Sequence, residues 1–132
     1  SIDMRWRSIM DEVKIEKFLY YTNGRSSDKV WGILSYNGAT LFKFWGRRGS
    51  ISKDVDTCTL NKETVDGRGG FDKALKKAVS AANKKIASGY RELSSEEIDT
   101  LVPGFKENIP SRLVMAQLSD DFRNMKRAEA DD

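Results

Sequence analysis

Residues 39–49, which read Ala-Thr-Leu-Phe-Lys-Phe-Trp-Gly-Arg-Arg-Gly, give the first indication of the fold. Apolar and polar residues alternate in the first half of this stretch, as they do in a β-strand whose successive side chains point to opposite faces. Phe42 and Phe44 share one face of the strand, whereas Lys43 and Trp45 share the other. The two phenylalanines mark the predicted core face, and Trp45 is therefore predicted to point outward.

The residues that follow Trp45 suit a binding surface. Gly46 carries no side chain, so a ligand or a second backbone can approach the indole ring closely. Arg47 and Arg48 add two permanent cations, and guanidinium groups pair well with phosphate. An exposed ring beside such cations predicts a surface for a sugar or base and its phosphate. The alternative interpretation is that Trp45 lies at the rim of the core and that both arginines belong to a solvated turn.

Turn signals on either side of this strand predict an antiparallel sheet. Asn37-Gly38 is the clearest hairpin signal, because both central residues of a type I′ turn need positive φ. Asn23-Gly24 lies in a polar loop, and a change of phase near Lys17 predicts a bulge or bend in the strand before it. The result is a meander of four or five strands, predicted at residues 11–21, 29–36, 39–44, 49–53 (with Ile51 inward) and 57–60.

A long amphipathic helix is predicted over residues 71–88. Apolar residues recur there at helical spacing, so one face is expected to be buried across the sheet. Gly89 is suited to end the helix in a left-handed conformation. The lysines make the other face basic, for which solvation is the default interpretation and contact with a nucleic-acid backbone the alternative. The glycine-rich residues 67–70 lack the features of a P-loop and are interpreted as a connector.

Two further helices are predicted in the C-terminal part of the chain. Ser94 to Glu97 has the form of a helix cap, and the short helix that it starts is expected to end before Pro103-Gly104. The second helix is predicted to open at Ile109-Pro110. It is expected to dock on the sheet, because Leu118 and Phe122 would otherwise be exposed; the alternative is that it lies in the groove of a partner.

These predictions divide the chain into three parts. An N-terminal arm covers residues 1–10, of which the three residues before Met4 are expected to be foreign to the natural protein. A domain of sheet and helix covers residues 11–93. A helical extension covers residues 94–132, and its last, acidic residues are expected to be disordered.

Charge is distributed unevenly along the sequence. Residues 1–93 contain 18 Lys and Arg against 11 Asp and Glu, whereas residues 94–132 contain 5 against 9. The first part therefore suits a polyanionic partner, and the second part does not. The acidic part could also fold against the basic part as an internal competitor.

The residue types that are absent or rare exclude several kinds of catalytic and metal-binding site. The sequence has no histidine, which removes His-ligated metal sites and histidine bases. The single cysteine, Cys58, excludes an intramolecular disulfide and suits a reducing cytoplasm. No apolar run approaches the roughly 18 residues of a membrane span, and no signal peptide is visible. We therefore expect a cytoplasmic protein without cofactor, metal or membrane partner.

The order of these features resembles the WGR domain, which is named for the tripeptide found here as Trp45-Gly46-Arg47. The resemblance covers roughly residues 13–93. It includes a strand with lysine and an aromatic residue at 28–31, an aromatic strand that runs into the tripeptide, and an amphipathic helix with a lysine-rich end before Gly89-Tyr90. WGR domains occur in DNA-dependent poly(ADP-ribose) polymerases and in stand-alone bacterial or phage proteins.

The resemblance implies an α+β fold, with a small twisted antiparallel sheet, one long helix across it, and here a C-terminal helical appendage. It also implies binding rather than catalysis. In the polymerases the motif's tryptophan packs on the sugar at a DNA end and the motif's arginine supports that contact, roles that fall by position on Trp45 and Arg47. No ADP-ribosyltransferase domain is present in this sequence, so that activity is not expected.

The leading hypothesis is a non-enzymatic nucleic-acid-binding module for DNA ends, nicks or single-stranded regions. Stacking on the tryptophan and phosphate contacts from basic side chains would carry the binding. The predicted contact residues are Arg25, Lys29, Lys43, Trp45, Arg47 and Arg48.

Two other function classes were weighed against it. A protein-protein interaction adaptor of bacterial or phage origin would use residues 94–132 to engage a protein partner. An enzyme is not expected, because carboxylate pairs such as Asp54 and Asp56 or Asp120 and Asp121 lack a convergent set of metal ligands.

Overall fold

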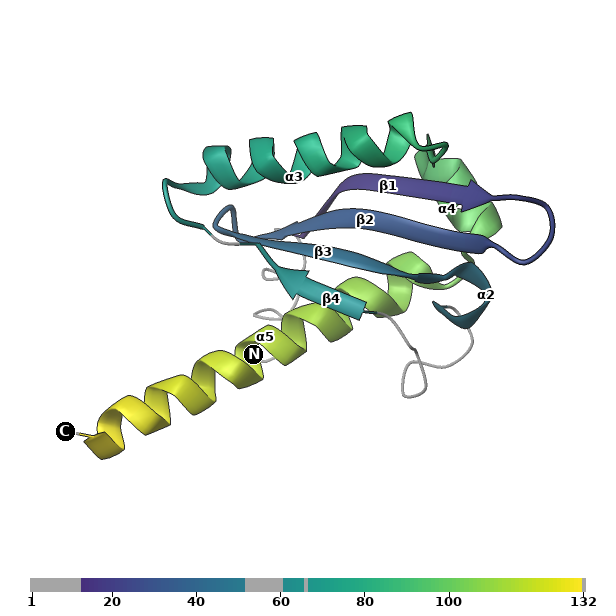
Figure 1. Ribbon diagram of the computed structural model, residues 1–132. Helices are drawn as coiled ribbons and strands as arrows, with labels where there is room; N and C mark the ends of the chain where they lie inside the picture. Colours follow the sequence, from purple (N-terminus) through teal and green to yellow (C-terminus); the bar gives the residue numbers. More distant parts are fainter. Residues whose placement is uncertain (1–12, 52–60, 66, 132) are drawn as a thin grey trace.

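The computed structural model describes residues 13–51, 61–65 and 67–131. The strands form one five-stranded antiparallel sheet in the order β4-β3-β2-β1-β5. Figure 1 shows α3 across one face of this sheet and α5 beyond the other, and the buried residues of α4 share a core cluster with those of α5. In chain order the elements are β1 (Lys14–Thr22), β2 (Asp28–Tyr36), β3 (Thr40–Arg47), α2 (Arg48–Ile51), β4 (Asn61–Thr64), α3 (Phe71–Ala87), β5 (Arg91–Glu92), α4 (Ser95–Leu101) and α5 (Phe105–Asp131).

This architecture confirms the predicted α+β fold with a C-terminal helix. The β1–β2 register shifts between Ile15 and Lys17, which confirms the irregularity predicted near Lys17. The hairpin turn between β2 and β3 has φ of 55° at Asn37 and 68° at Gly38. Both residues are thus in the left-handed conformation that the turn signal required.

The face opposite α3 holds the larger core cluster, and an aromatic triad lies at its centre. Phe18 of β1, Phe44 of β3 and Phe105 of α5 are almost fully buried. Their ring centroids lie 4.8–5.6 Å apart, distances at which aromatic rings attract one another. Gly32 of β2 lies between Phe18 and Phe44 in the register, and a Cβ atom there would stand 2.2 Å from the Phe44 ring. The triad therefore fits only over a residue without a side chain.

The second face of the sheet is also buried, because α3 covers it. Ala74, Ala78 and Ala82 recur every fourth residue and are buried against the sheet, so the helix approaches closely. Alternation predicts that the Trp45 side of β3 points outward, and this prediction is wrong. Trp45 is half-buried among the residues under α3, because both faces of the sheet carry helices.

Two local predictions need correction. Residues 48–51 form the short helix α2 rather than a third hairpin arm, although Ile51 is buried as expected. β3 pairs on its other side with β4 instead, a strand at residues 61–64 that the sequence did not predict. The strand predicted at 57–60 and the N-terminal arm at 1–10 lie outside the described residues.

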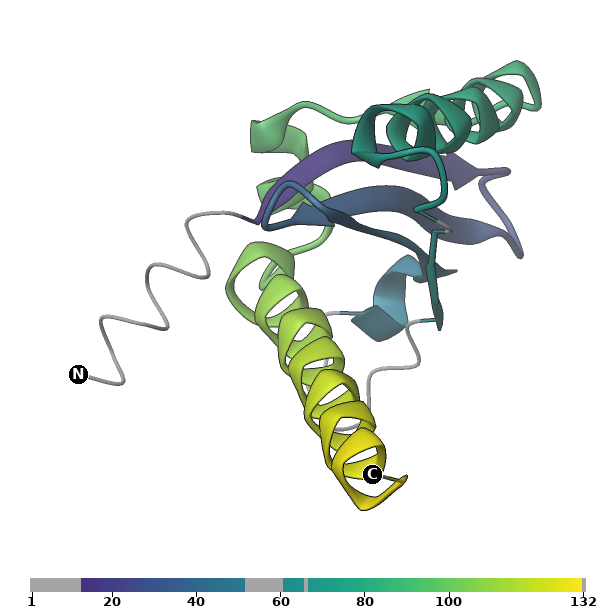
Figure 2. The same ribbon diagram turned by 90° about the vertical axis from the view of Figure 1, so that its left-hand side faces the viewer.

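The C-terminal helix also differs from its prediction. It begins at Phe105 and contains Pro110, although proline removes one helical hydrogen bond. Burial of Phe105 and Ile109 against the sheet stabilises this first part enough to offset the loss. The helix is continuous to Asp131, where disorder was expected, and its second half extends away from the sheet (Figures 1 and 2), which leaves Phe122 56% exposed rather than docked.

Candidate nucleic-acid interface

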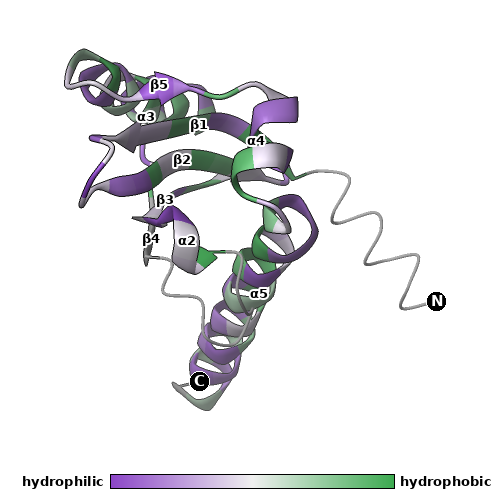
Figure 3. Cartoon of the chain, turned by 90° about the vertical axis from the view of Figure 1, so that its right-hand side faces the viewer, coloured by the Kyte–Doolittle hydropathy of each residue, from purple (hydrophilic) through white to green (hydrophobic). Residues whose placement is uncertain are grey.

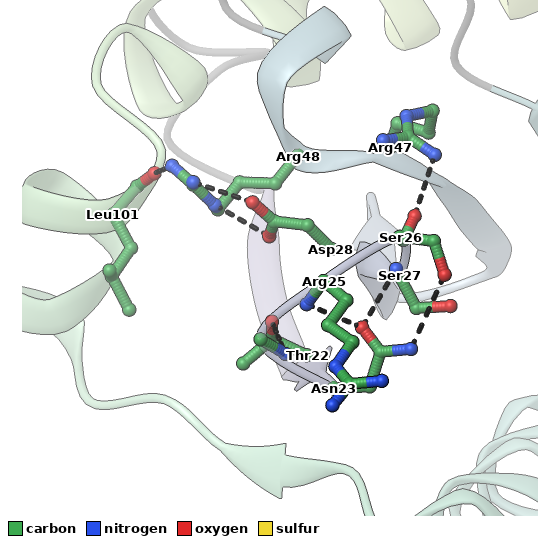
Figure 4. A network of polar contacts seen from close by, with 10 residues as sticks. Thr22, Asn23, Arg25, Ser26, Ser27, Asp28, Arg47, Arg48 and Leu101 are labelled. Atoms are coloured by element: carbon green, nitrogen blue, oxygen red, sulfur yellow. Dashed lines mark hydrogen bonds and ion pairs between the residues drawn. The ribbon is translucent and has the colours of Figure 1, made fainter.

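Arg48 was a predicted phosphate contact, but its side chain is partly buried and bonded to other parts of the protein. Its Nε and Nη2 atoms donate to the two carboxylate oxygens of Asp28 at 2.8 and 2.6 Å. Its Nη1 atom donates to the carbonyl oxygen of Leu101, at the end of α4, at 2.9 Å (Figure 4). The Arg48 hydrogen bonds hold the pKa of Asp28 below its ordinary value, although partial burial acts in the opposite direction. Arg48 is thus a structural clamp that joins β2 to α4.

Arg47, the last residue of β3, points away from Arg48, the first residue of α2 (Figure 4). It is exposed, and its Nη1 atom donates to the carbonyl oxygen of Ser26 at 3.2 Å. That contact holds the loop between β1 and β2 against the end of β3. In the loop, the side chain of Asn23 accepts hydrogen bonds from the backbone N–H groups of Arg25 and Ser27, both at 2.9 Å. The exposed Arg25 is thereby carried on an ordered turn (Figure 4).

Lys43 and Trp45 precede Arg47 in β3, and Trp45 packs on the α3 face of the sheet. Trp45 is directly opposite Trp31 in the β2–β3 register and packs with the residues under α3. Lys43 lies between Ile33 and Glu63 in the register and is half-buried. The structure therefore separates the predicted contact residues, because Lys29, Arg47 and Arg25 gather at the end of the sheet and Trp45 is partly covered.

A pair of tyrosines, not predicted from the sequence, forms an aromatic surface at that end of the sheet. The rings of Tyr21, at the end of β1, and Tyr90, after α3, lie 5.4 Å apart between centroids. Both side chains are half-buried. The backbone N–H of Tyr90 donates to the carbonyl oxygen of Lys85, and that of Gly89 to Ile86. This pattern is a Schellman motif, in which Gly89 at φ 112° turns the chain so that Tyr90 meets Tyr21.

Two lysines lie over the tyrosine rings. The Lys29 Nζ atom is 5.3 Å from the centroid of Tyr21 and 5.9 Å from that of Tyr90. The Lys85 Nζ atom is 5.6 Å from the centroid of Tyr90. Each ammonium group is therefore within the range of a cation–π attraction. Within the described residues neither lysine forms an ion pair with a carboxylate.

The β-sheet register places these groups side by side. Tyr21 is opposite Lys29, and Lys29 is opposite Arg47, so the three residues form a row across β1, β2 and β3. We call the row, together with Lys85 and Tyr90, the basic aromatic surface. In Figure 3 the start of β2, next to the loop between β1 and β2, is hydrophilic. The sequence indicated part of this surface, because Gly89 predicts a left-handed helix end next to Tyr90. The pairing of Tyr90 with Tyr21 could not be predicted, because it depends on how α3 crosses the sheet.

Other kinds of site have no support in the described part of the chain. No group of three or more Cys, Asp or Glu side chains there is placed to hold a metal ion. None of the described helices has both the length and the apolar character that crossing a membrane requires.

The chain matches no model of a known protein family, no curated protein and no solved structure. The resemblance to the WGR domain therefore rests on the residues of the sequence and stays a prediction.

Proposed function

We propose that this protein is a non-enzymatic nucleic-acid-binding module and that the basic aromatic surface is its contact surface. The observation that carries the proposal is the position of Lys29 and Lys85 over the tyrosine pair without a carboxylate partner among the described residues. A cation–π contact orients an ammonium group but leaves its N–H donors free for an anion. Two such groups beside an exposed arginine suit the phosphates of a nucleic-acid backbone.

The aromatic rings add a contact that a simple basic patch lacks. Bases that are not locked in a duplex stack on aromatic side chains, and each stacked base contributes about 1–3 kcal/mol. Tyr21 and Tyr90 are half-buried, so part of their surface remains accessible. This combination favours DNA ends, nicks or single-stranded regions over a continuous duplex. Trp45 is half-buried as well, and it packs among the residues under α3.

The assigned roles differ in part from those predicted from the sequence. Arg48 is assigned to the fold rather than to the ligand, because its hydrogen bonds to Asp28 and Leu101 occupy the guanidinium group. Arg47 remains a contact residue, since it is exposed and makes one hydrogen bond to a loop carbonyl. The dominant contribution to phosphate binding is assigned to Lys29 and Lys85.

Fluorescence anisotropy with labelled single-stranded, nicked and blunt duplex DNA at two salt concentrations tests the proposal. Lys29→Gln and Lys85→Gln are each expected to weaken binding and to lower the slope of log affinity against log salt by about 0.7–0.9. Lys76→Gln is the matched control, because Lys76 is an exposed lysine of the same helix outside the surface. Equal affinities for the Lys29, Lys85 and Lys76 variants would refute the assignment of the surface. Trp45→Ala, measured alongside, shows whether the indole adds to it.

An adaptor function through residues 94–132 is the second candidate. The first part of this segment packs on the sheet, with Ile98, Val102 and Phe105 in the core. The second half of α5 is the part that remains available to a partner, and its exposed apolar residues favour this candidate.

A further inference from the structure

The second half of α5 carries an apolar stripe that the described part of the chain leaves largely exposed. Met115, Phe122 and Met125 are 59%, 56% and 51% exposed, and Leu118 is the one member that also contacts the core. An open hollow of about 470 Å³ is lined by part of this stripe together with Ser119 and Arg123. Large apolar side chains gathered on one exposed helix face mark an interaction site.

The spacing of the stripe is that of a two-stranded coiled coil. Met115, Leu118, Phe122 and Met125 are separated by three, four and three residues, so they occupy positions a, d, a and d of two heptads. The helix extends away from the sheet in both views of the fold (Figures 1 and 2), so a second helix can lie along it without meeting the sheet. Most of the stability of a helix in a protein comes from packing of its apolar face.

The charged residues on either side of the stripe suit pairing with a second, identical helix. Asp121 occupies position g of the first heptad and Lys126 occupies position e of the second. In a parallel pair of identical helices, residue g of one chain lies beside the following residue e of the other. Asp121 of each copy would therefore meet Lys126 of its partner, which gives two ion pairs of opposite charge. An antiparallel pair would not bring these positions together.

We propose that a second copy of this chain covers the stripe, through a short parallel coiled coil of the two α5 helices. Two heptads bury little surface compared with a stable dimer interface, so the association is weak and depends on concentration. The self-association uses α5 and is independent of the basic aromatic surface.

Analytical ultracentrifugation of the full chain over a range of concentrations tests the proposal. The average mass is expected to rise from 15.0 kDa toward twice that value as the concentration increases. Phe122→Ala is expected to lower the association constant at least about tenfold, since it removes an apolar side chain from the centre of the interface. More than half of this side chain is exposed, so the substitution leaves the fold intact. A monomer at every concentration, including one whose stripe is covered by another part of the same chain or by an unrelated protein, overturns the proposal.

A charge exchange tests the parallel arrangement. Asp121→Lys and Lys126→Asp each place like charges opposite one another and are expected to lower the association constant about fivefold to tenfold. The double variant restores opposite charges and is expected to associate like the unaltered protein. Asp120→Lys and Arg127→Asp make the same charge changes at the outward position f and serve as matched controls. Failure of the double variant to recover association overturns the parallel pairing.

Discussion

Asp28 and Arg48 form a bidentate ion pair, with N–O distances of 2.6 and 2.8 Å, that joins β2 to the start of α2. The same guanidinium group donates a hydrogen bond to the carbonyl oxygen of Leu101 at the end of α4. Three segments far apart in the sequence thus depend on one side chain. Removal of either partner leaves the other partly buried without its counterion, which costs more than the loss of an exposed pair.

Asp28→Asn is expected to lower the free energy of unfolding at pH 7 by about 1–3 kcal/mol, because it weakens charge-assisted hydrogen bonds in a partly buried pair. The pKa of Asp28 is lowered in the folded protein from 3.8, so its stabilising contribution is present above that pH and is lost as the pH falls through the lower, folded-state value. The stability difference between the two proteins should therefore shrink in acid. Urea titrations at pH 7, 4 and 3 measure it; a constant difference would contradict the linkage.

Gly32→Ala is expected to destabilise the fold by about 2–4 kcal/mol, because the new Cβ atom would stand 2.2 Å from the Phe44 ring and 2.7 Å from the Lys17 carbonyl oxygen. Thermal unfolding followed by circular dichroism measures this. Gly49→Ala is the matched control, since a Cβ atom there has no neighbour within 4 Å and the residue does not have a positive φ. Similar unfolding temperatures for the two variants would show that the aromatic triad can move.

Gly89→Ala is expected to cost about 1–2 kcal/mol, because φ of 112° is unfavourable for a residue with a side chain and the Cβ atom would lie 3.3 Å from the Tyr21 ring. The same change should shift Tyr90 relative to Tyr21. Two-dimensional NMR of the tyrosine ring protons detects the shift, and unaltered contacts between the two rings would refute the positioning role of Gly89.

Ser94→Ala is expected to lower the stability by about 1 kcal/mol, because Ser94 and Glu97 form a reciprocal capping box at the start of α4. Glu97 also accepts a hydrogen bond from Arg91 at 2.6 Å, which lowers the pKa of its carboxyl group. Ser80→Ala on the exposed side of α3 provides the comparison. Denaturant titration of both variants should give a smaller midpoint for Ser94→Ala, and equal midpoints would contradict the capping role.

The parts of the fold that could be predicted are those determined by residues close together in the sequence. The turn at Asn37-Gly38, the helix that ends at Gly89 and the cap at Ser94 each follow from a few adjacent residues. The direction of Trp45 could not be read from alternation, because a strand buried on both faces carries apolar residues at both phases. The start of α5 was missed because Pro110 suggested a helix start, whereas tertiary burial of Phe105 extends the helix before it.

The candidate site was predictable to a similar extent. Lys29, Arg47 and Arg25 were identified from charge and turn patterns, and they do lie at one end of the sheet. Arg48 could not be distinguished from Arg47 by sequence, because its carboxylate partner is 20 residues away. Tyr21 and Tyr90 were missed for the same reason, since their contact joins a strand to the residue that follows a helix.

Arg47 and Arg48 are adjacent in the chain but support different layers of the protein. Insertion or deletion of a single residue just before them would change the direction of both side chains. Arg48 would then face the loop, and Arg47 would face Asp28. The number of residues between Phe44 and this dipeptide therefore determines which arginine faces Asp28 and which faces the loop between β1 and β2. Changes in residue type at these positions weaken individual contacts, whereas a change in their number disconnects the sheet from α4 and the β1–β2 loop together.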